Sequence, residues 1–271
     1  MKMLARLAAA ILLVSFAIPA AAEPIAPGTR AAHEVRLYIE ANDCAAAAAR
    51  LQYALAKDYP QVHLLAGVMY EAGICVKADW NRAVDFYSQA YSGGQKAAMY
   101  RLMAGFAAPE HGPDIAAALW WANRPNDEFR VNHCRVDDAY RDDPDRFVEE
   151  LRRWPQPRLA MCNYMVGVLA SLGGEIRYPE KARMLHLGGS VKLRFMPAVR
   201  RIDLKTGASK EYQMFGWING NAVEDRQSRS VKGTFEAVMR EVANRALKRY
   251  PQPAGIPSDT VSGIEFVFEL E

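Results

Sequence analysis

The stretch that decides how the C-terminal part of this chain folds is YPEKAR at residues 178–183, followed by GGSVKLRF at 188–195. Proline is favoured in a first helical turn because its missing N–H would be unpaired there, so the first segment predicts a short helix. The glycine pair predicts the end of that helix and a turn. In the second segment Val191, Leu193 and Phe195 alternate with charged residues, which predicts a strand with one apolar face.

A second helix and strand close the chain. Apolar residues recur at the 3.6-residue spacing of a helix from Phe235 to Ala246, which predicts an amphipathic helix of about 17 residues. In the last segment, 263–270, the residues alternate: one face carries Ile264, Phe266, Phe268 and Leu270, and the other carries Gly263, Glu265, Val267 and Glu269. Between the two ends we expect a turn at 205–207 and a second strand within 211–218. The prediction is an αββαβ order over about 174–271, with an antiparallel sheet.

These segments resemble the TonB C-terminal domain, a periplasmic domain that grips outer-membrane receptors. YPxxAR followed by GxVxxxF resembles its start, and FEAVMREVANRALKRYPQPAGIPSDTVSGIEFVFEL at 235–270 resembles its closing helix, loop and strand. The resemblance implies binding by strand addition, in which a partner's extended peptide pairs with the last strand. The partner-binding residues that it implies are Tyr178, Pro179, Ile264, Glu265, Phe266, Val267 and Phe268.

Two features depart from that family. The family has a tight Asp-Gly turn soon after its first strand, where this chain has 196–200, and a Gln- or Pro-rich approach to Tyr-Pro, where this chain has 175–177. These two segments therefore do not favour the usual receptor contact. For Tyr178, Phe266 and Phe268 the alternative interpretation is core packing.

The N-terminal half contains a repeat. Asp43, Asp79 and Asp114 each begin a similar motif, at successive shifts of 36 and 35 residues. A fixed period of this length is typical of stacked helix–turn–helix units, in which we expect each Asp to cap a helix and Gly73 to end one. The segments at 65–94 and 114–122 resemble Sel-one-like repeats, relatives of the tetratricopeptide family, over about 32–123. That resemblance implies a scaffold for protein–protein contacts.

The predicted fold class is therefore multi-domain: a short α-solenoid of helix-turn-helix repeats, then a small TonB-like α+β domain. We expect a repeat domain at 23–125, a helical linker or cap at 126–173 and the TonB-like domain at 174–271. Within the cap, Asp143 and Pro144 predict a helix start, and 159–172 predicts a buried apolar helix. Gly173 and Gly174 predict the boundary.

The first 22 residues predict an export signal. Lys2 and Arg6 precede an apolar run at 7–18 and the small residues of a cleavage site at 20–22. We therefore expect a periplasmic protein, or an inner-membrane one if the signal stays uncleaved. The formal charge is +3, from 34 basic and 31 acidic residues, two of the bases lying in the signal. A nearly neutral mature chain does not favour a nucleic-acid partner.

Export makes the four cysteines candidates for disulfides. Their order along the chain suggests the pairs Cys44–Cys75 and Cys134–Cys162, although three pairings are possible. The sequence has no CxxC and no histidine spacing typical of a metal site, so we expect no metal.

The function that these features favour is a periplasmic protein–protein interaction adaptor. Its partner would be an outer-membrane receptor or another envelope protein. One alternative is a TonB-type energy transducer for outer-membrane transport, held by an uncleaved N-terminal anchor. Another is a cell-wall or small-ligand binding module with a groove of Trp120, Trp121 and Tyr140. We expect no enzyme and no cofactor, because no nucleophile with a base, phosphate loop or paired-carboxylate site is evident.

Overall fold

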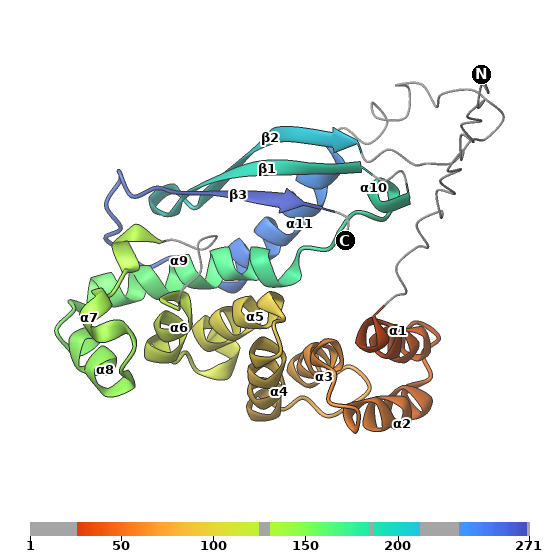
Figure 1. Cartoon of the computed structure of the whole chain (residues 1–271). Helices are drawn as coiled ribbons and strands as arrows, with labels where there is room; N and C mark the ends of the chain where they lie inside the picture. The colour runs from red at the N-terminus through yellow and green to blue at the C-terminus, as the bar shows by residue number, and fades with distance from the viewer. Residues whose placement is uncertain (1–25, 125–130, 185–186, 212–232, 270–271) are drawn as a thin grey trace, which may run out of the picture.

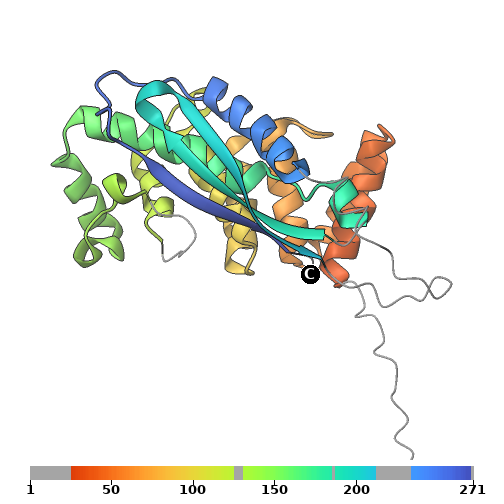
Figure 2. The same cartoon turned by 90° about the horizontal axis from the view of Figure 1, so that it is seen from above.

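The computed structural model describes residues 26–124, 131–184, 187–211 and 233–269. A helical N-terminal region of paired helices is followed by an α+β region with a three-stranded antiparallel sheet, as the sequence predicted. Figure 1 shows the sheet above a long central helix, α9, with the paired helices below it. Seen from above in Figure 2, the sheet lies across α9, and α11 runs beside it.

The paired helices of the N-terminal region follow the predicted repeat. Their bounds are α1 Pro27–Glu40, α2 Cys44–Leu55, α3 Pro60–Ala72, α4 Trp80–Ser92, α5 Lys96–Ala107 and α6 Ile115–Ala122. The carboxylates of Asp43, Asp79 and Asp114 each accept a hydrogen bond from the backbone N–H three residues later, at 3.0, 3.1 and 2.9 Å. Gly73 ends α3 in the left-handed conformation, with φ of 67°. The predicted caps and the predicted end are confirmed.

A short 3-10 turn, Pro109–His111, lies between α5 and α6, and a second, Asn132–Cys134, precedes the next helices. α7 is Asp138–Arg141, α8 is Pro144–Arg152 and α9 is Gln156–Glu175. Asp143 caps α8 as expected, accepting from the N–H groups of Asp145 and Arg146. α9 is longer than predicted, because Gly173 and Gly174 lie inside it. A Cβ on Gly173 would come within 2.6 Å of the Tyr100 ring, so this glycine permits close helix packing instead of ending the helix.

α9 is the central helix of the core. Among the described residues, the segment Gln156–Met184 is the one long and apolar enough to cross a membrane by length and composition, but 61% of its most apolar window is buried inside the fold. A helix that is apolar all round and covered by other elements is typical of a protein core. α9 contacts α5 and α6 on one side and α11 on another. It therefore joins the repeats to the sheet region.

The α+β region consists of α10 Glu180–Met184, β1 Leu187–Met196, β2 Arg201–Glu211, α11 Thr234–Arg249 and β3 Ser262–Phe268. The strand order is β2-β1-β3, and both pairings are antiparallel. Val191, Leu193 and Phe195 are buried on the face that α9 and α11 cover, as the alternation predicted.

Two predictions about this region were wrong. Gly188 and Gly189 do not break the chain; they lie in β1, paired with Lys210 and Ser209. The turn between the first two strands is at Pro197–Arg200, not at 205–207, which lies within β2. Proline fixes its own φ and donates no ladder hydrogen bond, so Pro197 suits a turn, and Arg200 completes it at φ of 51°.

The second strand is accordingly earlier than expected. β2 ends at Glu211, where the prediction placed its start, and residues 212–218 lie outside the described part of the chain. Gly207 lies beside a register shift between β1 and β2, between Gly189 and Val191. A Cβ on Gly207 would overlap the Ser190 hydroxyl of β1, so the irregular pairing requires a glycine at this position.

Both disulfides follow the order of the cysteines along the chain. Cys44 bonds Cys75 with a Cα–Cα distance of 4.7 Å, and Cys134 bonds Cys162 with a distance of 5.4 Å. The first joins the start of α2 to the turn after α3, and the second joins the segment before α7 to α9. Of the three possible pairings, the structure contains the one that chain order suggested.

The core is continuous across the predicted boundary at 173–174. One buried cluster runs from α5 and α6 through α9 to β1, α11 and β3. A separate cluster lies among α1, α2 and α3. The sheet is therefore packed on the helices through shared apolar side chains and not through a linker alone.

Candidate functional site

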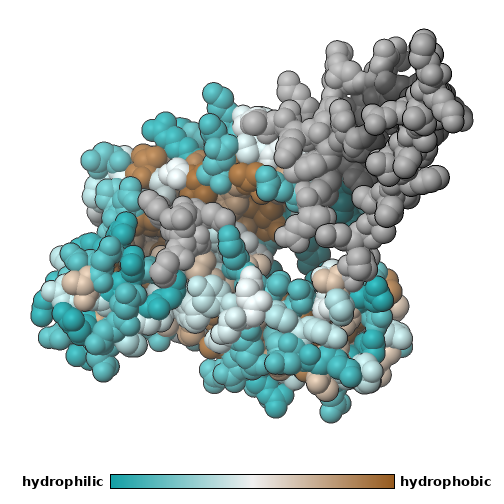
Figure 3. All heavy atoms as spheres, in the orientation of Figure 1, coloured by the Kyte–Doolittle hydropathy of each residue, from teal (hydrophilic) through white to brown (hydrophobic). Residues whose placement is uncertain are grey.

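The first candidate site is the edge of β3. β3 pairs with β1 on one side, and among the described strands none pairs with its other side. In an antiparallel strand, alternate residues direct their N–H and C=O groups away from the neighbour, so half of these groups are open at an edge. In Figures 1 and 3, which share one orientation, apolar surface gathers where β3 runs in front of the sheet. This is the geometry that strand addition requires.

The inner face of β3 is incompletely covered. Phe268 is buried, but Ile264 and Phe266 are half-buried, opposite the buried Leu193 and Val191 of β1. The sheet ends at this edge, so no further strand of the described chain covers their open side. An added strand would bury the rest of these two side chains, and buried apolar area stabilises association by about 25 cal/mol per Å².

The outer face of β3 carries Gly263, Glu265 and Val267, all exposed. Glu265 is held by β1: it accepts a hydrogen bond from the Ser190 hydroxyl at 2.6 Å and lies 3.8 Å from the Lys192 ammonium. The two faces of β3 thus match the predicted alternation.

Tyr178, from the other end of the region, lies beside the end of β3. Its ring packs edge-to-face on Phe235 and Phe268, with centroids 5.8 and 6.0 Å away, and its hydroxyl donates to the Leu187 carbonyl. The structure therefore brings Tyr178 and Phe268, two predicted site residues, into one aromatic cluster. Pro179 is buried immediately before α10, so it shapes the helix start and has no free surface for a partner.

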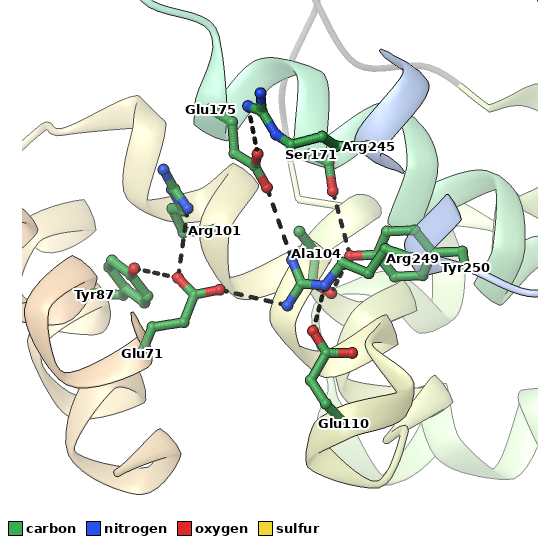
Figure 4. Close-up of polar contacts among 10 residues, drawn as sticks. All are labelled: Glu71, Tyr87, Arg101, Ala104, Glu110, Ser171, Glu175, Arg245, Arg249 and Tyr250. Carbon is green, nitrogen blue, oxygen red and sulfur yellow. Dashed lines mark hydrogen bonds and ion pairs between the residues drawn. The ribbon is translucent and has the colours of Figure 1, made fainter. Parts of the chain in front are cut away.

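A second feature is a cluster of ion pairs that attaches α11, and with it the sheet, to the helices. Figure 4 shows Arg249, in the last turn of α11, reaching between three carboxylates from other elements. Its guanidinium lies 3.6 Å from Glu71, 2.5 Å from Glu110 and 3.8 Å from Glu175. Burial opposes the charge of Arg249, but Tyr250, Glu110 and Glu71 outweigh it, so the pKa of Arg249 is raised. We call the contacts of Arg249 and Tyr250 with the helices the junction.

The junction continues on both sides of Arg249. Glu71 accepts from the Tyr87 hydroxyl at 2.5 Å and lies 3.6 Å from Arg101. Its side chain is 9% exposed, so its carboxylate depends on these partners for solvation. On the other side, Glu175 at the end of α9 also pairs with Arg245, at 3.2 Å. The basic residues of α11 thus pair with carboxylates of α3, of the 3-10 turn Pro109–His111 and of α9.

Tyr250 completes the junction from the residue after α11. Its hydroxyl donates to the Ala104 carbonyl at 2.7 Å and accepts from the Ser171 hydroxyl at 3.3 Å. Its ring fits against Gly167 of α9, where a Cβ would come within 2.4 Å. Burial raises the pKa of Tyr250 to about 12. The end of α11, and with it the sheet, is therefore anchored by buried polar contacts to the helices beneath.

The junction was not predicted from the sequence. Three carboxylates of the junction, Glu71, Glu110 and Glu175, are far apart in the sequence. The local sequence around each predicts only an exposed surface residue. The local sequence signal for the junction is the pair of basic residues, Lys248 and Arg249, in the last turn of α11. Such a turn is ordinarily explained by the helix dipole.

The three aromatic residues of the alternative binding groove, Trp120, Trp121 and Tyr140, are partly buried and pack against the core. Trp120 lies edge-on to Phe147 at 5.2 Å, and Trp121 lies edge-on to Tyr91 at 5.3 Å. A shallow hollow of about 510 Å³ does occur nearby, but charged residues and a different tryptophan, Trp154, line it. In the described part of the chain, no group of three His, Cys, Asp or Glu residues could hold a metal ion.

Comparison of the chain with models of protein families, with curated proteins and with solved structures found no match. The resemblances to the TonB C-terminal domain and to Sel-one-like repeats therefore remain predictions from the sequence.

Proposed function

We propose that this chain is an exported protein–protein interaction adaptor of the TonB C-terminal kind. A partner's extended segment pairs with the β3 edge, and the helical repeats offer a second scaffold surface. The partner is an outer-membrane receptor or another envelope protein. The single observation that carries the proposal is the open edge of β3, with the half-buried Ile264 and Phe266 beneath it.

Export is supported by the cysteines. Two disulfides are compatible with an extracytoplasmic protein, because such bonds persist in oxidising compartments. Placing the protein in the periplasm rests on the signal predicted at 1–22.

The junction supports an adaptor with two fixed surfaces. Arg249 and Tyr250 tie α11 to α3, α5 and α9, so the β3 edge keeps its direction relative to the repeats. Two partners bound at these surfaces would be held in a defined relative orientation.

The test of the edge uses two matched valine substitutions in the full chain. Val267 is 63% exposed on β3, and Val199 is 65% exposed in the turn between β1 and β2. A lysine on an edge strand opposes pairing with another strand, whereas exposed substitutions elsewhere change folding stability by less than about 0.5 kcal/mol. We expect Val267→Lys to lose partners captured from an outer-membrane extract and Val199→Lys to keep them.

Capture is followed by identification of the bound proteins and by crosslinking at β3. Equal capture by both variants would place the binding surface elsewhere. Turnover of a periplasmic substrate by the purified protein, with no protein partner recovered, would overturn the adaptor.

A further inference from the structure

The β3 edge has a gap on its outer face at Gly263. Gly263 pairs in register with Arg194 of β1, and both residues are exposed. Among the described residues, a Cβ on Gly263 would meet only the Leu193 carbonyl oxygen, at the ordinary contact distance of 3.8 Å, so their packing does not require a glycine here. The consequence of the glycine is that no side chain of β3 stands between Arg194 and the open edge.

The charges around Arg194 leave it without an ionic partner. Lys192 pairs with Glu265 across to β3, and Arg201 pairs with Asp203 on β2, at 3.2 Å. Asp203 is also the residue opposite Arg194 in the register of β1 and β2. Within the described residues, however, Arg194 itself makes no ion pair or side-chain hydrogen bond. In the described part of the chain, Arg194 is thus an unpaired cation on the outer face of β1, one strand away from the β3 edge.

The spacing of strands lets Arg194 reach an added strand. Neighbouring strands are about 4.8 Å apart, so a strand added to β3 would lie about 10 Å from β1. A long arginine side chain can cross above Gly263, and a carboxylate on the added strand can reach back to meet it. Glu265, two residues after Gly263, already pairs with Lys192. The negative charge of Glu265 opposes a second carboxylate beside it on the added strand.

We propose that the segment bound at β3 is an amphipathic strand with an aspartate or glutamate on its outer face, beside Gly263 and paired with Arg194. Its alternate side chains are apolar and cover Ile264 and Phe266 on the inner face. This inference rests on the proposed function, since it describes the partner of the same edge. It specifies the chemistry that would distinguish one extended segment from another.

The test uses three acetylated peptides of sequence SVTVXVTVS, in which X is Glu, Thr or Lys. X lies on the polar face, so each peptide directs X outward when its valines face inward. Binding is followed through backbone amide resonances of β3 in the full-length, isotope-labelled protein. An exposed ion pair contributes up to about fivefold in affinity, so we expect the Glu peptide to bind up to about fivefold more tightly than the Thr peptide. Like charges oppose each other, so we expect the Lys peptide to bind more weakly than the Thr peptide.

Matched variants locate the effect at Arg194. Arg194→Glu is expected to reverse the preference. Lys205→Glu makes the same charge change on the same face of the sheet, but on β2 and away from the β3 edge, and is expected to leave the preference intact. Gly263→Glu supplies Arg194 with a partner within the chain and is expected to abolish the preference, whereas Gly263→Gln fills the gap without adding a charge and is expected only to weaken it.

The possible outcomes separate this inference from the proposed function. Equal binding of all three peptides at β3, or a preference for the Lys peptide, would overturn the acidic partner while leaving strand addition in place. Absence of β3 shifts with every peptide would contradict strand addition itself, and with it this inference. If Arg194→Glu fails to fold by circular dichroism, Arg194→Gln replaces it, with loss of the preference as the expected result.

Discussion

The rings of Tyr178 and Phe268 lie edge-to-face with their centroids 6.0 Å apart, although the two residues come from the start and the end of the α+β region. Phe235, at the start of α11, completes the cluster at 4.5 Å from Phe268. Edge-to-face aromatic pairs contribute about 0.5–1.5 kcal/mol beyond their buried area. The cluster therefore holds the end of β3 against the beginning of the region.

The hydroxyl of Tyr178 should stabilise this arrangement measurably. Tyr178→Phe keeps the ring but removes the hydrogen bond to the Leu187 carbonyl. We expect a loss of about 1 kcal/mol in the free energy of unfolding, measured by urea denaturation, because a buried carbonyl loses its donor. Tyr38→Phe, at a 41% exposed site on α1, is the control and should change stability by less than about 0.5 kcal/mol. Equal stability of the two variants would show that the Tyr178 hydroxyl does not stabilise the fold.

Local chemistry explains why parts of this fold were predictable. Asp43, Asp79 and Asp114 are helix caps whose partners lie three residues away, so their spacing alone revealed the repeat. The faces of β1 and β3 follow from strict alternation, which does not depend on distant contacts.

The errors occurred where one residue type serves two local structures. Gly173 and Gly188 both looked like breaks, yet one lies in α9 and the other in β1. Whether such a glycine ends an element or lies inside it depends on the side chains that pack against it in space. At Gly173, the Tyr100 ring occupies the space that a Cβ would need. The junction was not predictable for a similar reason: the pairing of Glu71 with Arg249 depends entirely on how α3 and α11 are placed in space.

The junction should contribute to stability through Glu71. Glu71→Gln leaves Arg101 and Arg249 with less compensating charge in a site where the Glu71 side chain is 9% exposed. We expect a loss of about 2 kcal/mol in the free energy of unfolding, since breaking a buried pair leaves a charge without its partner. The control is Glu149→Gln, whose side chain is 65% exposed and pairs with Arg153 on the surface. That variant should lose less than about 0.5 kcal/mol. A loss as large as that of Glu71→Gln would mean that the junction stabilises the fold no more than a surface ion pair does.

The two disulfides should contribute similar amounts. They close loops of 31 and 28 residues, and cross-links of that length stabilise a fold by about 3–4 kcal/mol. We expect Cys44→Ser with Cys75→Ser, and separately Cys134→Ser with Cys162→Ser, each to lose about that much in urea denaturation. Peptide mapping of the unreduced protein should recover both cross-linked peptide pairs. Recovery of any other pairing would contradict the connectivity.

Cleavage of the signal separates the adaptor from an anchored energy transducer. We expect N-terminal sequencing of the cell-envelope fractions to find a chain beginning at Glu23 in the soluble periplasmic fraction, after the small residues at 20–22. A chain that retains residues 1–22 in the inner membrane would instead support the anchored alternative. The β3 edge variants are informative in either case, because they act on the other end of the chain.

Stability should fall at alkaline pH because of buried tyrosines. Burial raises the pKa of Tyr250 to about 12, above its ordinary value of 10, and burial together with Glu71 raises the pKa of Tyr87 as well. The folded state keeps protons that the unfolded chain releases above pH 10. The stabilisation is therefore fully present below pH 10 and is lost as the pH rises from 10 towards 12, by about 1.4 kcal/mol per pH unit for Tyr250. Urea denaturation at pH 9 and pH 11 measures this slope.

The variant Tyr250→Phe assigns part of that slope to one residue. At neutral pH it should cost about 1 kcal/mol, because the Ala104 carbonyl loses its donor. Between pH 10 and pH 11 it should lose less stability than the wild type, since one of the buried hydroxyls is gone. Tyr53→Phe, at a 58% exposed site, controls for removing a hydroxyl from the surface. An unchanged slope in Tyr250→Phe would show that the end of α11 opens before Tyr250 ionises, so that the junction does not hold the sheet on the helices under these conditions.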